Sequence, residues 1–144
     1  MRTTRRGASY RAVADTRLVW VEDGPSAGGR MFEIRAGRRA LDVALDRGAD
    51  IARLAYRGDE LGWLGPTLAP TRARPPDIED GLGTMRAFDG FLVTCGLDHH
   101  GVPARSDASG FCYPPRGGNV HPLHGRIVGA SASLAEHGFN EEAA

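Results

Sequence analysis

Most side chains able to carry chemistry lie in one stretch of the chain, residues 85–127. It contains both cysteines and four of the five histidines: Cys95, Cys112, His99, His100, His121 and His124. Histidine is the side chain whose unperturbed charge changes close to neutral pH, so it suits proton transfer as well as hydrogen bonding. Glycines and prolines between these residues predict loops, and binding residues often lie on loops held by a rigid scaffold. This stretch is therefore the predicted location of a functional site.

The same side chains are nitrogen and sulfur donors, so a metal site is one alternative. A structural zinc site needs four donors that close a tetrahedron, often supplied by paired cysteines. No Cys-x-x-Cys pair occurs here, and adjacent histidines such as His99 and His100 do not easily face one ion. We therefore expect no metal and no cofactor. Nucleophilic catalysis by Cys95 is also disfavoured, because a cysteine inside an apolar strand is usually a packed, inert thiol.

Short strands joined by tight turns are expected to position this stretch. Apolar runs, alternating or continuous, predict strands at residues 17–21, 31–34, 41–45 and 50–56. In the third of these, Leu and Val alternate with Asp and Ala, which predicts one buried face and one wet face that carries the acids. The sequence Arg57-Gly58-Asp59-Glu60 predicts a hairpin turn ahead of Leu61 and Trp63.

The remaining segments have weaker or irregular patterns. Four prolines predict a long loop over residues 66–80, and glycine, proline and serine predict another over residues 98–119. Between these loops, Phe91-Leu92-Val93 predicts a short buried strand. Residues 1–28 are predicted to be weakly ordered, and the alanine-rich tail, residues 128–144, is predicted to be a frayed helix. The expected fold class is all-β with antiparallel strands.

Charge and composition exclude several classes of function. The chain has 144 residues with 18 basic and 18 acidic side chains, for a formal net charge of zero. A neutral chain gives no electrostatic basis for binding nucleic acid or a membrane surface. No apolar run approaches the length of a membrane span, about 18 residues, and no apolar segment follows the N-terminal arginines as in a secretory signal. Two cysteines without such a signal are expected to be reduced thiols, so we expect a cytoplasmic protein.

Two motifs in the histidine-bearing stretch resemble a known family. The sequence GFLVTCGLDHHGVP at residues 90–103 is followed by PLHGRI at residues 122–127. This pair is similar to motifs of uncharacterised aldose 1-epimerase-like proteins in the galactose-mutarotase-like superfamily. Residues 32–66 resemble the opening strands of the same proteins. The resemblance implies that residues 29–127 are the N-terminal portion of a large antiparallel β-sandwich, a partial galactose-mutarotase-like supersandwich.

The resemblance also implies roles for individual residues. In these enzymes a histidine protonates the sugar ring oxygen while a carboxylate takes the proton of the anomeric hydroxyl, so that the ring opens and recloses. His124 matches the family's His-Gly motif, which hydrogen-bonds the sugar, and is the expected catalytic residue. Together with His124, three residues are expected to contact a sugar or sugar phosphate: Arg86, Asp98 and Arg126. The alternative role for Arg86 and Asp98 is an ordinary ion pair. The alternative role for His124 is a structural contact within its loop.

The sequence departs from the family pattern at two points. Gly90-Phe91 stands where relatives carry two glycines, so a phenyl ring is expected to reshape the floor of the pocket. The family's acid histidine and base glutamate have no matching positions, since Glu136 and His137 lie in a tail that the resemblance does not cover. The expected function is carbohydrate binding, with sugar epimerisation in full-length relatives; the alternative is a non-catalytic truncated remnant or a sugar-binding module. Unpartnered strands are expected to let the chain associate with itself through open sheet edges.

Overall fold

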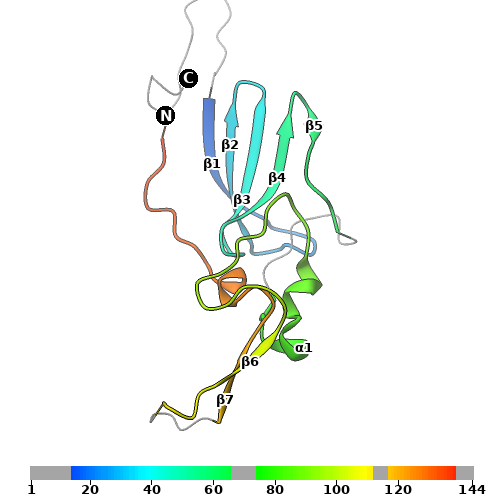
Figure 1. The fold of residues 1–144 in the computed structure, drawn as a ribbon. Coiled ribbons are helices and arrows are strands. Elements are labelled where there is room, and N and C mark those ends of the chain that lie inside the picture. The colour runs from blue at the N-terminus through cyan, green and yellow to red at the C-terminus, as the bar shows by residue number, and fades with distance from the viewer. Residues whose placement is uncertain (1–13, 66–73, 112–116, 139–144) are drawn as a thin grey trace, which may run out of the picture.

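Two antiparallel sheets make up the fold of the computed structural model, which describes residues 14–65, 74–111 and 117–138 (Figure 1). Five strands form the main sheet in the order β1-β2-β3-β4-β5: β1 Ala14–Trp20, β2 Arg30–Ala36, β3 Arg39–Ala44, β4 Asp50–Tyr56 and β5 Asp59–Glu60. A separate ribbon pairs β6 Ala104–Asp107 with β7 Gly118–His121. The sheet lies at one end of the molecule and the ribbon at the other (Figure 1). The prediction of an all-β antiparallel fold is confirmed.

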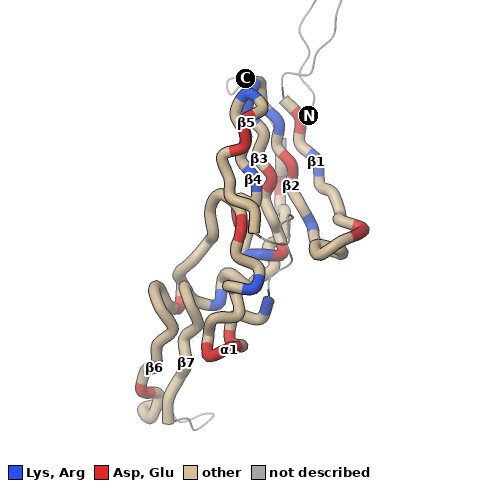
Figure 2. The backbone as a smooth tube through the Cα atoms, turned by 90° about the vertical axis from the view of Figure 1, so that its right-hand side faces the viewer, with Lys and Arg blue, Asp and Glu red and all other residues tan. Residues whose placement is uncertain are grey.

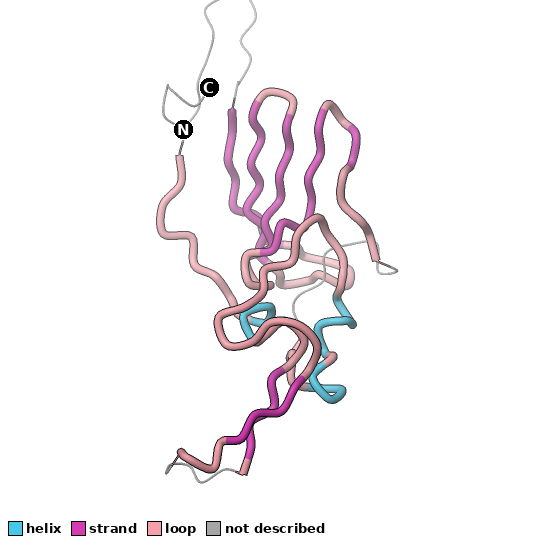
Figure 3. The backbone as a smooth tube through the Cα atoms, in the orientation of Figure 1, coloured by secondary structure: helices cyan, strands magenta, loops and turns pink. Residues whose placement is uncertain are grey.

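Short helical turns and loops occupy the space between the sheet and the ribbon (Figure 3). The helical elements are α1 Ile78–Gly81, η1 Gly83–Ala87 and η2 Arg126–Gly129, the last two being 3₁₀-helices. Among the described residues, no helix has the length and apolar content needed to cross a membrane. The irregular middle of the molecule holds most of the histidine-bearing stretch, as its glycines and prolines predicted, while β6 and β7 of the same stretch form the ribbon.

The hairpins of the main sheet form where the sequence has strand patterns and turn residues. Gly37 (φ 58°) turns the chain between β2 and β3, and Gly58 (φ 95°) turns it between β4 and β5. Both glycines adopt left-handed backbone angles that disfavour side chains with a Cβ atom. The four predicted strands of the main sheet are confirmed, with the fourth spanning Asp50–Tyr56 as expected.

The prediction that the acidic face of β3 is exposed to solvent is wrong for Asp42. Asp42 is buried, because Arg35 reaches it from β2 and Arg53 reaches it from β4. Arg35 Nη1 lies 2.5 Å from Asp42 Oδ1, and Arg53 Nη1 lies 3.6 Å from Asp42 Oδ2. A carboxylate loses its hydration at low cost only when such partners replace the water. Period-two alternation alone could not show that two cross-strand arginines cover the acid.

Two further predictions for the middle of the chain are wrong. Phe91-Leu92-Val93 makes a single bridge between Leu92 and Ile51 in place of a strand, and Phe91 and Leu92 are about half exposed. The region from residue 98 to residue 119 is partly ordered, since β6 lies within it and pairs with β7. Both differences arise from long-range hydrogen bonds that no local pattern encodes.

The tail is extended over residues 130–138, so the prediction of a frayed helix is wrong there; residues 139–144 lie outside the described part. The tail runs back along the main sheet (Figure 1). Ala132 N donates to Leu45 O at 2.7 Å, and Arg30 Nη2 donates to Ala132 O at 3.0 Å. Further along, the ring of His137 packs edge-on against the ring of Phe32 on β2. These contacts satisfy backbone groups that a helix would have paired internally.

The core between these elements is built mostly from small side chains. Six of the nine buried apolar residues of the described part are alanines, four of them in strands of the main sheet, and the larger ones are Phe32, Leu45 and Val128. Charged residues of both signs are interspersed along the strands and loops of the described chain (Figure 2). A small core means that each buried contact is a larger share of the total stability.

Candidate functional site

A cavity of about 410 Å³ lies where the loop after η1 passes the His-Gly loop. Its aromatic wall consists of Trp63, Phe88 and Phe91, and its polar lining includes Asp89, Cys95 and His124. The rings of Trp63 and Phe88 are 5.7 Å apart and tilted against each other. Such a mixture of apolar walls and a few polar groups is typical of sites for small molecules.

Backbone pairing between distant segments builds the aromatic wall. Trp63 N donates to Gly90 O at 2.9 Å, and Gly90 N donates to Trp63 O at 2.7 Å. Gly90 has a φ of 110°, and a Cβ atom there would lie 3.0 Å from Ile51 O. Glycine is therefore required at this position by both conformation and space. Phe91 follows directly and lines the cavity.

A buried cluster of charges lies behind the cavity. The guanidinium of Arg47 pairs with the carboxylates of Asp50 and Asp89, and all three side chains are almost fully buried. Arg47 Nη2 also donates to the backbone oxygen of Asp89 at 2.9 Å. Burial raises the pKa of Asp50, even though Thr94 N and Arg47 donate to it. The cluster ties the turn after β3 to the loop that carries the aromatic wall.

One oxygen of this cluster lacks a hydrogen-bond partner. Asp89 Oδ1 pairs with Arg47, whereas Asp89 Oδ2 is buried and has no partner among the described residues. Asp89 is one of the residues that line the cavity. A buried acceptor without a partner costs about 1–3 kcal/mol, so such an atom calls for an explanation. Sequence reasoning missed Trp63, Phe88 and Asp89, because the pairing that brings them to His124 has no local signature.

The His-Gly loop holds His124 in a strained conformation. His124 has a φ of 60°, in the left-handed region that most residues with a Cβ atom avoid. Its backbone is held at both ends, since Gly96 N donates to His124 O and His124 N donates to Gly101 O, both at 2.9 Å. His124 is one of the residues that line the cavity. Strain of this kind is often found at functional positions.

Asp98 and Arg126 brace this loop from outside the cavity. Asp98 accepts from Arg126 N and from Arg126 Nη1, both at 2.9 Å, and these hydrogen bonds lower the pKa of the Asp98 carboxyl. Arg126 also pairs with Asp77 at 2.9 Å and lines a different cavity, of about 630 Å³, beside the β6–β7 ribbon. The structure therefore places these two predicted residues in an ion pair next to His124, and neither lines the aromatic cavity.

Arg86 lies on the exposed side of η1, and it too is held in an ion pair. Arg86 Nη2 is 2.6 Å from Glu79 Oε1, and about two-thirds of the Arg86 side chain is exposed. It does not line the cavity that holds His124. Of the four residues singled out by the resemblance, only His124 borders this cavity.

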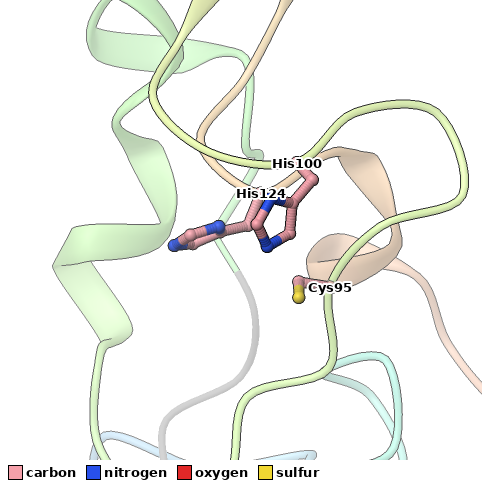
Figure 4. A group of neighbouring side chains, drawn as sticks. All are labelled: Cys95, His100 and His124. Atoms are coloured by element: carbon pink, nitrogen blue, oxygen red, sulfur yellow. The ribbon is translucent and has the colours of Figure 1, made fainter.

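Three donor side chains of the histidine-bearing stretch lie close together: Cys95, His100 and His124 (Figure 4). Each offers one ligand atom, and these atoms all lie within 4.8 Å of one another. Cys95 is a free, exposed thiol. Cys112 lies outside the described residues. The sequence analysis expected no metal site, because the linear spacing of the donors could not show that two loops bring these three together.

The other two histidines of the stretch form a pair of their own. The rings of His99 and His121 stack at a centroid distance of 5.2 Å. His99 Nε2 is 2.7 Å from Val102 O, and His121 Nε2 is 2.9 Å from Ser106 Oγ on the ribbon. The adjacent residues His99 and His100 therefore face different partners, as expected for consecutive side chains.

Comparison with known proteins places the chain in a family. Residues 26–143 match the model of a family described as Domain of unknown function (DUF4432). The chain belongs to this family. No curated protein and no solved structure matches the chain. The DUF4432 match includes all the residues of the cavity and extends beyond Ile127, so the extended tail that packs along the sheet is part of the family domain.

Proposed function

We propose that the chain binds a carbohydrate in the aromatic cavity beside His124. The observation that carries this proposal is the combination of three aromatic side chains with a histidine and a buried carboxylate oxygen that lacks a partner. A pyranose has apolar C–H faces that pack against aromatic rings and hydroxyls that need hydrogen-bond partners at its edge. The cavity supplies both kinds of contact.

Asp89 and His124 are the proposed hydroxyl-binding groups. Asp89 Oδ2 is an acceptor, and a sugar hydroxyl that donates to it would restore the hydrogen bond that the described residues leave unmade. Arg47 holds the other oxygen of the same carboxylate, which fixes the orientation of the carboxylate. His124 accepts or donates from the opposite part of the lining, next to Cys95. A neutral hexose fits these contacts, and a hexose phosphate belongs in the test panel because the motif resemblance includes phosphate-binding relatives.

The residues favour carbohydrate binding without catalysis over sugar epimerisation. Ring opening needs an acid and a base on one bond, and each contributes about 10²–10⁴-fold in rate. Of the catalytic residues described for aldose 1-epimerase-like enzymes, His124 is the one with a match in this sequence. We therefore expect anomer exchange of a bound hexose, followed by NMR, to run at the buffer rate. An exposed free thiol at Cys95 suits a reducing compartment, and we propose the cytoplasm as the location.

Titration calorimetry and ligand-observed NMR over a panel of hexoses, uronates and hexose 6-phosphates test the proposal. We expect His124→Ala and Trp63→Ala to abolish measurable binding. Trp20→Ala is the matched control, since Trp20 is an exposed tryptophan on β1 that does not line the cavity. Arg86→Ala distinguishes the cavity from the motif-based expectation, because Arg86 contacts Glu79 and does not line the cavity.

Three results would overturn this assignment. The first is a wild-type chain that binds no member of the panel. The second is a sugar that still binds after both His124→Ala and Trp63→Ala, which would place the sugar elsewhere. Loss of binding in Arg86→Ala with full binding in Trp63→Ala would likewise move the site to η1.

A further inference from the structure

Cys95, His100 and His124 form a group of donors that chemistry associates with metal ions. Thiolate sulfur and imidazole nitrogen are the ligands that zinc prefers in proteins. The three ligand atoms lie within 4.8 Å of one another, and the three side chains approach one another from two loops (Figure 4). Two of the side chains are exposed and the third is half-buried, so an ion can reach them from solvent.

The backbone around these donors is already fixed. Gly96 follows Cys95, and Gly101 follows His100. Each of these glycines is hydrogen-bonded to the backbone of His124. Both bonds are 2.9 Å long, one to His124 O and one from His124 N. The three Cα atoms are thereby held in a fixed relation, so only side-chain rotation remains for binding. Preorganisation of this kind lowers the entropic cost of holding a ligand.

We propose that Cys95 Sγ and the imidazoles of His100 and His124 bind one Zn²⁺ ion. Bond lengths of about 2.0–2.3 Å place the ligand atoms of a tetrahedral ion about 3.3–3.7 Å apart. The three atoms therefore need to approach by about 1 Å, which rotation of the exposed Cys95 and His100 side chains provides. The thiol releases its proton to solvent as the Zn–S bond forms.

Three protein donors leave the fourth position of a tetrahedral zinc ion open. Sites of this type bind water or a substrate atom at that position, in contrast to structural sites closed by four protein ligands. Cys95 and His124 both line the aromatic cavity, so an ion that they hold would adjoin this cavity. The metal assignment rests on the three donors alone and stands whether or not the cavity binds a sugar.

Cobalt(II) is the probe, because it occupies zinc sites and its absorption reports both tetrahedral geometry and thiolate coordination. The untagged full-length chain is used with Cys112→Ser as the parent, so that Cys95 is the only thiol. We expect one cobalt ion per chain, with tetrahedral d–d bands and a thiolate-to-cobalt charge-transfer band, and we expect zinc to displace it. No sugar is present in this assay, so its result is separate from that of the sugar titrations.

His100→Ala is the decisive variant, because His100 is exposed and its loss leaves the fold intact. We expect it to weaken cobalt and zinc binding more than about 100-fold, since loss of even an outer-shell partner typically costs about 10–100-fold. His124→Ala should act in the same way. His99→Ala is the matched control and should bind like the parent, because His99 stacks on His121 instead. Circular dichroism and thermal melting verify that each variant is folded.

Three outcomes would overturn the proposal. One is an octahedral cobalt spectrum without a thiolate band. Another is full metal affinity in folded His100→Ala, and the third is equal loss of affinity in His100→Ala and His99→Ala. Any of these would show that the three side chains do not act together as a site.

Discussion

Left-handed backbone angles at single residues shape the two loops that carry the site. Leu97 (φ 69°) and His124 (φ 60°) adopt this conformation despite their side chains, and Gly96, Gly101 and Gly125 adopt it as glycines. A residue with a Cβ atom pays about 1–2 kcal/mol for such an angle. Surrounding contacts must supply that energy, and around His124 they are the two backbone hydrogen bonds to the facing loop.

Gly125→Ala should destabilise the protein by about 2–5 kcal/mol, from left-handed strain together with overpacking. A Cβ atom there would lie 2.7 Å from Gly96 O and 2.8 Å from His99 O, and would also overlap the Asp98 carboxylate. Gly101→Ala is the matched control. It has a similar φ of 101° but no atom within 4 Å of the added Cβ, so it should cost only about 1–2 kcal/mol. Urea unfolding of both variants measures the difference, and equal losses would mean that the loop yields to the clash.

Strands and tail are joined by the ion pair of Arg30 with Asp46 at the end of the main sheet. Arg30 Nη2 lies 2.6 Å from Asp46 Oδ1, and the same guanidinium nitrogen donates to Ala132 O in the tail. The hydrogen bonds from Arg30 hold the pKa of Asp46 below its usual value. The extended tail is therefore fastened to β2 by the Arg30 guanidinium, which the Asp46 carboxylate in the turn after β3 holds in place.

Asp46→Asn should cost about 1.5–3 kcal/mol at neutral pH, the usual range for a hydrogen bond to a charged group. Because the folded pKa of Asp46 lies below its unfolded value of 3.8, its contribution is complete above that value. It is lost as the pH falls through the folded pKa, when the carboxylate takes up a proton. The variant should therefore lose less stability than wild type between about pH 5 and pH 2.

Chemical unfolding at both ends of that pH range measures the effect. Asp59→Asn is the control, since Asp59 is an exposed carboxylate in the β4–β5 hairpin. Hydrogen exchange of the Ala132 amide, which donates to Leu45 O, reports on the tail. Parallel pH curves for Asp46→Asn and wild type would contradict the role assigned to this pair.

At the scale of the whole molecule, the main sheet has edge strands whose outer sides no other described segment pairs with, and exposed apolar side chains lie beside one of them. Strands β1 and β5 are the outer strands, and β5 has only two residues. Beyond β5, Leu61 and Leu64 are more than half exposed, next to Trp63. Open edges with neighbouring apolar groups are typical sites for pairing with another chain.

We propose that the chain associates with itself at the β5 end of the sheet. Light scattering over a concentration series should show a mass that rises above that of the monomer. The double variant Leu61→Lys/Leu64→Lys should remain monomeric, because two charges would be buried without partners at the contact. Val102→Lys is the control, being an exposed apolar residue in a distant loop. A wild-type chain that is monomeric at every concentration would contradict the proposal.

The sequence by itself determined the first four strands of the main sheet and one residue of the cavity lining. Alternation and turn residues are local properties, so they located the hairpins and ended the fourth strand at Tyr56. The His-Gly motif indicated His124, which does border the cavity. Glycines and prolines correctly predicted that the histidines lie mainly in irregular segments.

The tertiary structure decided which side chains meet. Asp42 is buried because arginines of neighbouring strands cover it, and the tail is extended because its backbone groups pair with the sheet. Equally, the contact of His100 with His124 depends on left-handed turns and hydrogen bonds between loops more than 20 residues apart. Such contacts depend on how distant segments are placed relative to one another, which local periodicity and turn chemistry do not encode.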